Sequence, residues 1–200
     1  MPDSAFASGF TDAPLESQAV FRACMAALSR PATLQPLAAG VAPPAPLTPE
    51  LAAVALALAD HEAPLWLDAA LAAEPAVRRY LAFHTGARFV ADPADAAFAL
   101  IAEARHCPAF AVFAAGSDEY PDRSTTLVIA VDRLSTGTDL VFSGPGIKGR
   151  AGLAAAPLPA DFEAELAANH ASFPRGIDLF LVSDGIVAAL PRSSKLIGEA

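Results

Sequence analysis

The sequence predicts an α/β fold in which one mixed β-sheet is flanked by helices. Two observations favour this class. Helical and strand patterns are interspersed along the chain, and the second half has more adjacent strands than strict β-α-β alternation would give. The length of 200 residues suits one domain. We therefore expect residues 1–200 to form a single domain.

Three helices are expected in the first half. Thr11 or Asp12 caps the first one. That helix ends at Arg30-Pro31, because the residue before a proline avoids the α region. The second begins at a Thr-Pro-Glu sequence and covers residues 51–58, and the third begins at Pro75 and ends at Gly86. The apolar stripe of the first helix is predicted at Leu15, Ala19, Cys24 or Met25, and Leu28.

Short apolar runs between these helices predict strands. Pro36 marks the first run as an edge strand, because proline cannot donate to a sheet ladder. Residues 92–95 form a turn rich in aspartate and proline, and residues 103–124 predict a short helix and a long loop. The strands expected in this part of the chain are residues 33–37, 64–67, 88–90 and 96–101.

The second half is predicted to hold four strands and one helix. Two strands, residues 125–131 and 138–142, are separated by a turn that contains Gly137, and a loop over residues 143–149 follows. A late amphipathic helix covers residues 159–170. The side chains expected to face inward from it are Phe162, Leu166 and Ala167.

A hairpin closes the chain and organises the candidate site. Asp184-Gly185 tolerates the positive φ values of a two-residue turn, so the apolar runs on either side predict paired strands. This pairing brings Arg175 and Arg192 out at the same end of the hairpin. The polar ends either fix neighbouring loops or contact an anion or a partner. The candidate contacts there are Arg175, Asp178, Arg192 and Ser193.

Residues His84 and Thr85 form a second, smaller candidate at the predicted end of the third helix. A histidine at this position interacts favourably with the negative end of the helix dipole, which is a structural role. A contact with a ligand or partner is the alternative. Asp60-His61-Glu62 resembles a set of metal ligands in composition, but three adjacent residues do not easily face one ion, so we interpret this segment as a solvated loop.

The net charge of the chain argues against nucleic acid as a partner. The chain carries a formal charge of −9 and no basic run, which argues against binding to a nucleic-acid backbone. No apolar run reaches the roughly 20 residues that span a bilayer. The N-terminus also lacks the basic start of a signal peptide. We therefore expect a cytoplasmic protein that binds neither nucleic acid nor membrane.

The sequence contains few candidate catalytic motifs. The two cysteines have no zinc-ligand spacing. Gly144–Gly149 matches G-x-G-x-x-G, but Pro145 lacks an N–H for a phosphate, and the prolines that follow leave little room for the required helix. Lys148 and Lys195 are the only lysines, and neither lies at a credible pocket for a Schiff base. We expect no catalytic, cofactor or metal residues, and whether the chain is itself an enzyme is left open.

Several short motifs occur in a fixed order over most of the chain, and Phe-Pro-x-Gly-Ile-Asp-Leu followed by Leu-Pro-Arg-Ser is the most specific of them. In this order the chain resembles the PhnH family, the H subunit of the bacterial carbon–phosphorus lyase core complex. Residues 103–124 carry none of the resemblance. The matching segments are Ser17–Arg22, Met25, Ser29–Pro31, Ala57–Asp60, Pro64–Leu67, Leu81–Ala87, Leu140–Ile147 and Phe173–Ser194.

The resemblance implies a fold similar to the large domain of pyridoxal-phosphate-dependent transferases, without their cofactor residues. It also implies a homodimer when the protein is alone, and a larger assembly with the G, I and J subunits. That assembly takes part in making α-D-ribose 1-methylphosphonate 5-triphosphate during phosphonate catabolism. The leading hypothesis is a non-catalytic structural or partner-binding subunit of this complex. The alternative is a small-anion or nucleotide-binding module that uses Arg175 and Arg192.

Overall fold

The computed structural model describes residues 8–197. Its first helix, α1 (Ala13–Ser29), begins where predicted, because the Asp12 carboxylate accepts a hydrogen bond from the Leu15 N–H at 3.3 Å. The predicted apolar stripe is wrong in part. The buried positions are Val20, Cys24 and Ala27, whereas Leu15, Ala19 and Met25 are exposed. The row at i, i+4 and i+7 faces the core, and these three residues lie outside it.

The helices α2 (Pro49–Leu58) and α4 (Pro75–Thr85) confirm the other two predictions for the first half. The Thr48 hydroxyl caps α2, and Gly86 ends α4 in the left-handed conformation with φ 69°. Residues 103–124 contain two short 3₁₀ turns, η3 (Ala104–His106) and η4 (Phe110–Val112). The other helical segments are α3 (Ala69–Ala72), which was not predicted, η2 (Pro93–Asp95) and the late helix α5 (Phe162–Ala171).

The main sheet has six strands in the order β1-β8-β7-β4-β3-β2, and it is mixed, as predicted. Four neighbours, β7, β4, β3 and β2, run parallel, whereas β8 is antiparallel to β7 and β1 is antiparallel to β8. Residues 88–90, predicted as a strand, make only an isolated bridge from Phe89 to Leu65. The strand bounds are β1 (Gln35–Pro36), β2 (Leu65–Leu67), β3 (Phe98–Ile101), β4 (Thr126–Ala130), β7 (Asp178–Ser183) and β8 (Ile186–Leu190).

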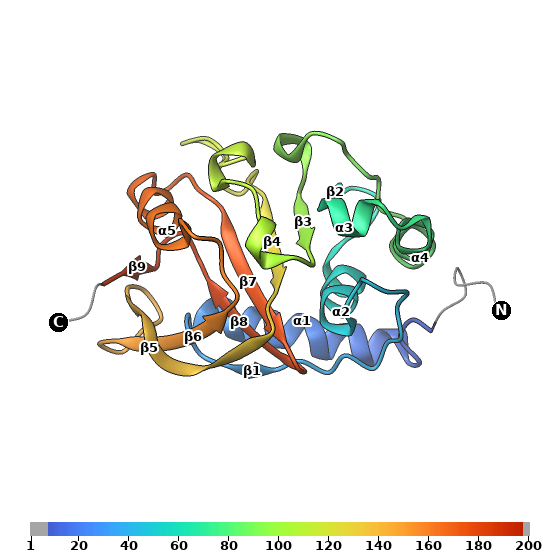
Figure 1. Cartoon of the computed structure of the whole chain (residues 1–200), viewed down its shortest axis with the longest axis horizontal. Helices are drawn as coiled ribbons and strands as arrows, with labels where there is room; N and C mark the ends of the chain where they lie inside the picture. Colours follow the sequence, from blue (N-terminus) through green and yellow to red (C-terminus); the bar gives the residue numbers. More distant parts are fainter. Residues whose placement is uncertain (1–7, 198–200) are drawn as a thin grey trace.

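A smaller antiparallel sheet with the order β6-β5-β9 lies beside the main one (Figure 1). Its strands are β5 (Arg133–Ser143), β6 (Ala151–Ala156) and β9 (Lys195–Leu196). The predicted turn at Gly137 is wrong, because Gly137 lies inside β5 where the register with β6 shifts between Thr136 and Leu140. Gly137 marks a bulge there, a common use of glycine within a strand. Strand β6 itself was not predicted.

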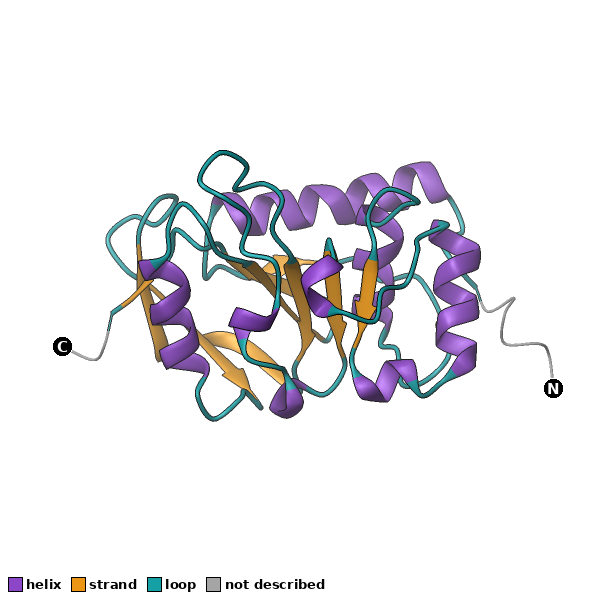
Figure 2. Cartoon of the chain, turned by 90° about the horizontal axis from the view of Figure 1, so that it is seen from above, coloured by secondary structure: helices purple, strands orange, loops and turns teal. Residues whose placement is uncertain are grey.

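Both faces of the main sheet are buried, which explains why its strands are almost continuously apolar. Along β7, Phe180 and Val182 face one hydrophobic cluster while Leu179 and Leu181 face the other. Helices α1, α2 and α4 cover the first face, and α1 is the long helix that runs along the molecule in Figure 2. Helix α5 and the small sheet cover the second face. From α5, Phe162 and Leu166 are buried as predicted, but Ala167 is exposed.

Candidate functional site

The turn of the closing hairpin lies at the opposite end of β7 and β8 from Arg175 and Arg192. Asp184 and Gly185 have φ values of 44° and 71°, so the predicted two-residue turn is confirmed. The Gly185 N–H donates to the Glu50 carboxylate at 2.9 Å, and its carbonyl accepts from the Leu37 N–H at 2.7 Å. These contacts fix the turn against the first residues of α2.

The polar end of the hairpin is held together by Arg192 and Asp178. The Arg192 guanidinium donates to Asp178 through Nη2 to Oδ2 at 2.6 Å and through Nε to Oδ1 at 3.2 Å. The Arg192 backbone N–H also donates to Oδ1 at 2.9 Å. The two side chains are 12% and 24% exposed, so this is a largely buried, two-pronged ion pair.

The same guanidinium reaches a loop that is distant in the sequence. Its Nη1 donates to the Pro121 carbonyl at 2.6 Å, and its Nη2 donates to the Ser124 hydroxyl. Arg192 therefore joins the start of β7, the end of β8 and the loop before β4. This geometry supports the structural interpretation of Arg192, because most of its donors are used within the chain.

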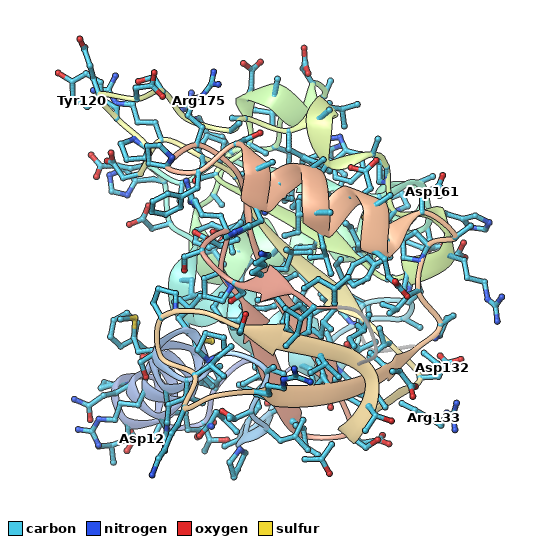
Figure 3. The ribbon with its side chains drawn as sticks, turned by 90° about the vertical axis from the view of Figure 1, so that its left-hand side faces the viewer. Asp12, Tyr120, Asp132, Arg133, Asp161 and Arg175 are labelled. Carbon is cyan, nitrogen blue, oxygen red and sulfur yellow. The ribbon has the colours of Figure 1, made fainter. Side chains whose placement is uncertain are left out.

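Arg175 lies at the same end of the hairpin but in a different environment. Its side chain is 53% exposed and pairs with Asp118 at 3.4 Å. Figure 3 shows Arg175 and Tyr120 at one corner of the molecule, near one end of α5, whereas Asp161 lies at the other end of that helix. The hairpin thus brings Arg175 and Arg192 to one region, but each guanidinium binds its own carboxylate.

A shallow hollow of about 370 Å³ opens beside these residues. Ser193 is half-buried at its rim, and the neighbouring Ser194 hydroxyl is buried without a hydrogen-bond partner in the described chain. Two carboxylates and one arginine line the hollow, so it has no excess of positive charge for an anion. The lining residues are Pro121, Asp122, Phe173, Pro174, Asp178, Pro191, Arg192 and Ser193.

Asn169 on α5 was not identified from the sequence, although it determines how β7 begins. Its side-chain oxygen accepts from the Ile177 N–H at 2.8 Å, and its amide nitrogen donates to the Ile177 carbonyl at 2.9 Å. Ile177 is 1% exposed, so both backbone groups would otherwise be buried without partners. The only sequence signal is one polar residue on a helix, which does not identify its partner.

His84 and Thr85 lie at the end of α4, far from the hairpin, because α4 and α5 are at opposite ends of the molecule (Figure 1). The Thr85 hydroxyl donates to the Leu81 carbonyl at 2.7 Å and accepts from the Ala87 N–H at 3.0 Å. The His84 ring contacts the rings of Tyr80 and Phe83. These contacts support the structural role of both residues at the helix end.

The carboxyl ends of the parallel strands are where open α/β sheets usually bind ligands. Here the position is taken by Asp68, which follows β2 and is only 4% exposed. One of its oxygens accepts from the Leu71 N–H at 2.9 Å, and the other accepts from Ala102 and Glu103 at 2.8 and 3.0 Å. The backbone donors at this edge therefore bind a carboxylate of the chain itself.

Neither cysteine is suited to nucleophilic chemistry. Burial raises the pKa of the Cys24 thiol to about 12. Burial also raises the pKa of Cys107 to about 12, with smaller contributions from the charges of Glu165 and Asp68. Because the thiolate is the reactive form, both side chains are almost entirely unreactive thiols at neutral pH.

No group of three or more His, Cys, Asp or Glu side chains within residues 8–197 is placed to hold a metal ion. Across the same residues, every helix is too short or too polar to cross a bilayer.

Comparison with known proteins gives matches along nearly the whole chain. Residues 8–197 match the family described as "Bacterial phosphonate metabolism protein (PhnH)". The chain is 44% identical over 194 residues to the Rhizobium meliloti (strain 1021) protein named "Alpha-D-ribose 1-methylphosphonate 5-triphosphate synthase subunit PhnH", covering 97% of this chain and 96% of that protein. It is 36% identical over 81 residues to the "Putative C-P lyase subunit protein HtxG" of Stutzerimonas stutzeri, which is 40% of this chain and 42% of that protein.

Proposed function

Because this chain belongs to the PhnH family of bacterial phosphonate metabolism proteins, we propose that it is a structural, partner-binding subunit of the carbon–phosphorus lyase core complex. In this role it supports the synthesis of α-D-ribose 1-methylphosphonate 5-triphosphate in phosphonate catabolism. The observation that carries the proposal is the 44% identity, over almost the full length of both chains, to a protein named as a subunit of that synthase. Residues 1–200 act as one domain in this proposal.

The proposed partners are those that the resemblance to the PhnH family implies. The chain forms a homodimer when alone and joins the G, I and J subunits in the cytoplasm. It supplies no cofactor, metal or catalytic residue of its own, and it contributes contacts that assemble the complex. The second relative, named a C-P lyase subunit, supports a place in a multi-subunit assembly.

The corner formed by Arg175, Tyr120 and Phe173 is the proposed contact site at the hairpin end. Tyr120 and Phe173 are large and exposed, and Arg175 lies beside them. Tyrosine and arginine are enriched among residues that dominate binding energy at protein interfaces. Arg192 and Asp178 fix the position of this corner, because they join the 121–124 loop to the hairpin.

Co-purification tests the proposal. We expect a tagged form of this chain to retain the G, I and J subunits at equal stoichiometry when all four are co-expressed. Arg175→Ala should weaken that retention while leaving the melting temperature unchanged, since Arg175 is exposed. A chain that elutes alone from cells containing all four subunits would contradict the proposal.

The alternative, a small-anion or nucleotide-binding module at Arg175 and Arg192, remains a prediction. The hollow beside Arg192 gives it a location, but Asp122 and Asp178 also line that hollow. Isothermal calorimetry with ATP and with methylphosphonate tests it directly. Heat of binding that disappears in Arg175→Ala would favour the alternative, and titrations at background heat would remove it.

A further inference from the structure

Strand β6 is a six-residue edge strand with one free side. Its pairing with β5 runs from Arg133 opposite Ala156 to Phe142 opposite Ala151. Apart from this ladder, its backbone forms no hydrogen bond with any other residue in the described part of the chain. A row of unpaired N–H and C=O groups of this kind is a template for pairing with another extended segment.

The hydrogen bond from Ile197 to Val141 identifies which backbone groups are free. The Ile197 N–H donates to the Val141 carbonyl at 2.8 Å, so Val141 directs its backbone groups toward β9. In an antiparallel strand these directions alternate, so Leu140 and Phe142 direct theirs toward β6. The backbone groups of their partners on β6, Leu153 and Ala151, therefore point toward β5. The N–H and C=O groups that point away from β5 are those of Gly152, Ala154 and Ala156.

The other outermost strands of the two sheets, β1, β2 and β9, are protected. Strand β1 has two residues, one of which is Pro36, and β9 also has two residues and begins with Lys195. Both features discourage edge pairing. The outer side of β2 is covered, because the Leu65 N–H donates to Arg88 at 2.8 Å and its carbonyl accepts from Val90 at 3.0 Å. Strand β5 also has an unpaired side over residues 133–140, because β9 pairs only with its end, but β5 is not an outermost strand. Among the outermost strands within residues 8–197, β6 is thus the only one longer than two residues whose free side is neither covered nor interrupted by proline or lysine.

Two cations flank the amino end of β6. Lys148 and Arg150 are exposed, and neither forms an ion pair with another described residue. Both belong to the loop that leads from β5 into β6, at the end of the edge where β6 begins. The edge therefore presents free backbone groups over six residues and positive charge at one end.

We propose that an extended segment of a partner subunit adds to β6 as the fourth strand of the small sheet. This inference rests on the proposed function, because it assigns a surface to the subunit's assembly. The segment is five to seven uncharged residues long, roughly 17–24 Å at the usual strand rise. It carries an Asp or Glu at the end that faces Lys148 and Arg150. Backbone hydrogen bonds supply affinity in this mode of recognition, and the flanking charges set the direction of the segment.

Ala154→Pro tests the proposal at the centre of the edge. Proline removes the outward N–H of residue 154 and leaves the ladder to β5 in place, which edge strands tolerate. The matched control is Ala154→Ser, which keeps the N–H in a side chain of similar size. With the G, I and J subunits co-expressed, we expect Ala154→Pro to reduce recovery of the complex at least tenfold. Ala154→Ser should give wild-type recovery, and both variants should melt within a few degrees of the wild type.

Hydrogen–deuterium exchange on the wild-type complex provides a second measurement that needs no variant. The amides of Gly152, Ala154 and Ala156 should exchange at least tenfold more slowly in the complex than in the isolated chain. A complex that forms normally with Ala154→Pro and leaves these amides unprotected would overturn the inference while the proposed function stands. If the wild type forms no complex, the proposed function fails first.

The isolated chain distinguishes a second copy from a partner subunit. We expect these three amides to exchange rapidly in the isolated protein, whatever its mass by light scattering. Protection that appears in the isolated chain, together with a dimer mass that Ala154→Pro reduces to a monomer, would assign the edge to self-association and overturn the proposed occupant.

Discussion

The Arg192 guanidinium binds both oxygens of the Asp178 carboxylate, and the same side chain also binds the carbonyl of Pro121, 71 residues earlier in the sequence. One arginine therefore joins the two strands of the closing hairpin to a loop on a different part of the chain. The loop has no strand pairing of its own apart from one isolated bridge at Ser124. Backbone hydrogen bonds also hold this loop, from the Thr125 N–H to the Ala114 carbonyl and from the Gly176 N–H to the Ala115 carbonyl, each at 2.8 Å, so Arg192 is one of several contacts that fix it.

Removing the Arg192 side chain should destabilise the fold. Arg192→Ala leaves a mostly buried carboxylate without its partner, and we expect a loss of about 2–4 kcal/mol in unfolding free energy, measured by urea denaturation. Arg192→Lys should recover only part of this, because an ammonium group cannot make the two-pronged contact. Arg175→Ala is the control, and its exposed ion pair should change stability by less than about 1 kcal/mol. Equal effects at the two arginines would contradict the structural role of Arg192.

Asn169→Ala tests the contact between α5 and β7. The variant leaves the buried N–H and C=O of Ile177 unpaired, so we expect a loss of about 1–3 kcal/mol in the free energy of unfolding. Ser172→Ala is the control at the C-cap of the same helix. The Ser172 hydroxyl is exposed and bonds only to the Ala168 carbonyl, so the variant should be close to neutral. A neutral Asn169→Ala would mean that water replaces the amide.

Gly185→Ala isolates the backbone cost of the hairpin turn. A Cβ at this position would meet nothing closer than the Leu37 carbonyl at 3.7 Å, so crowding is not the issue. The cost comes from φ at 71°, and we expect about 1 kcal/mol of destabilisation by thermal or urea unfolding. Asp184→Asn should be nearly neutral because asparagine accepts positive φ as well as aspartate does. A neutral Gly185→Ala would indicate that the turn relaxes to another type.

The two thiols predict a loss of stability in alkaline solution. Their pKa values are raised from 9.0 to about 12 in the folded chain, so the unfolded chain releases these protons first as pH rises. The contribution of the two protonated thiols to the free energy of unfolding is fully present below pH 9 and is lost between pH 9 and pH 12. Each thiol should contribute a slope of up to about 1.4 kcal/mol per pH unit in that window. Urea unfolding at pH 8, 9 and 10 should show the decline, and Cys24→Ala should reduce its slope. A slope unchanged by that variant would exclude Cys24 as a source.

Local signals in the sequence predicted the elements that depend on local chemistry. The turn at Asp184-Gly185, the cap at Thr48 and the left-handed Gly86 each involve residues whose own backbone preferences decide the structure. The polar end of the hairpin was also predicted, because a two-residue turn fixes the register of both strands. Arg192 and Asp178 were both named as candidate contacts at that end, but their ion pair with each other was not predicted.

Elements that depend on distant partners were missed. Strand β6 reads Ala-Gly-Leu-Ala-Ala-Ala, which has low strand propensity, and its pairing with β5 makes it a strand. Gly137 suggested a turn, although a bulge uses the same conformational freedom. Asp68 binds amides 34 and 35 residues later in the chain, and no local pattern reports such a contact. The buried face of α1 was predicted wrongly in part, because the apolar residues of this helix occur on more than one of its faces.

The Asp68 carboxylate binds backbone amides at the carboxyl edge of the sheet, so those amides are not free to bind a ligand. Its bonds to the amides of Leu71, Ala102 and Glu103 come from the chain itself and are present at any solute concentration. A protein whose strand ends are ordered by a bound phosphate gains stability as that ligand is added, following mass action. In this protein a side chain of the same molecule occupies the equivalent position, so adding phosphate should leave the stability of this edge unchanged.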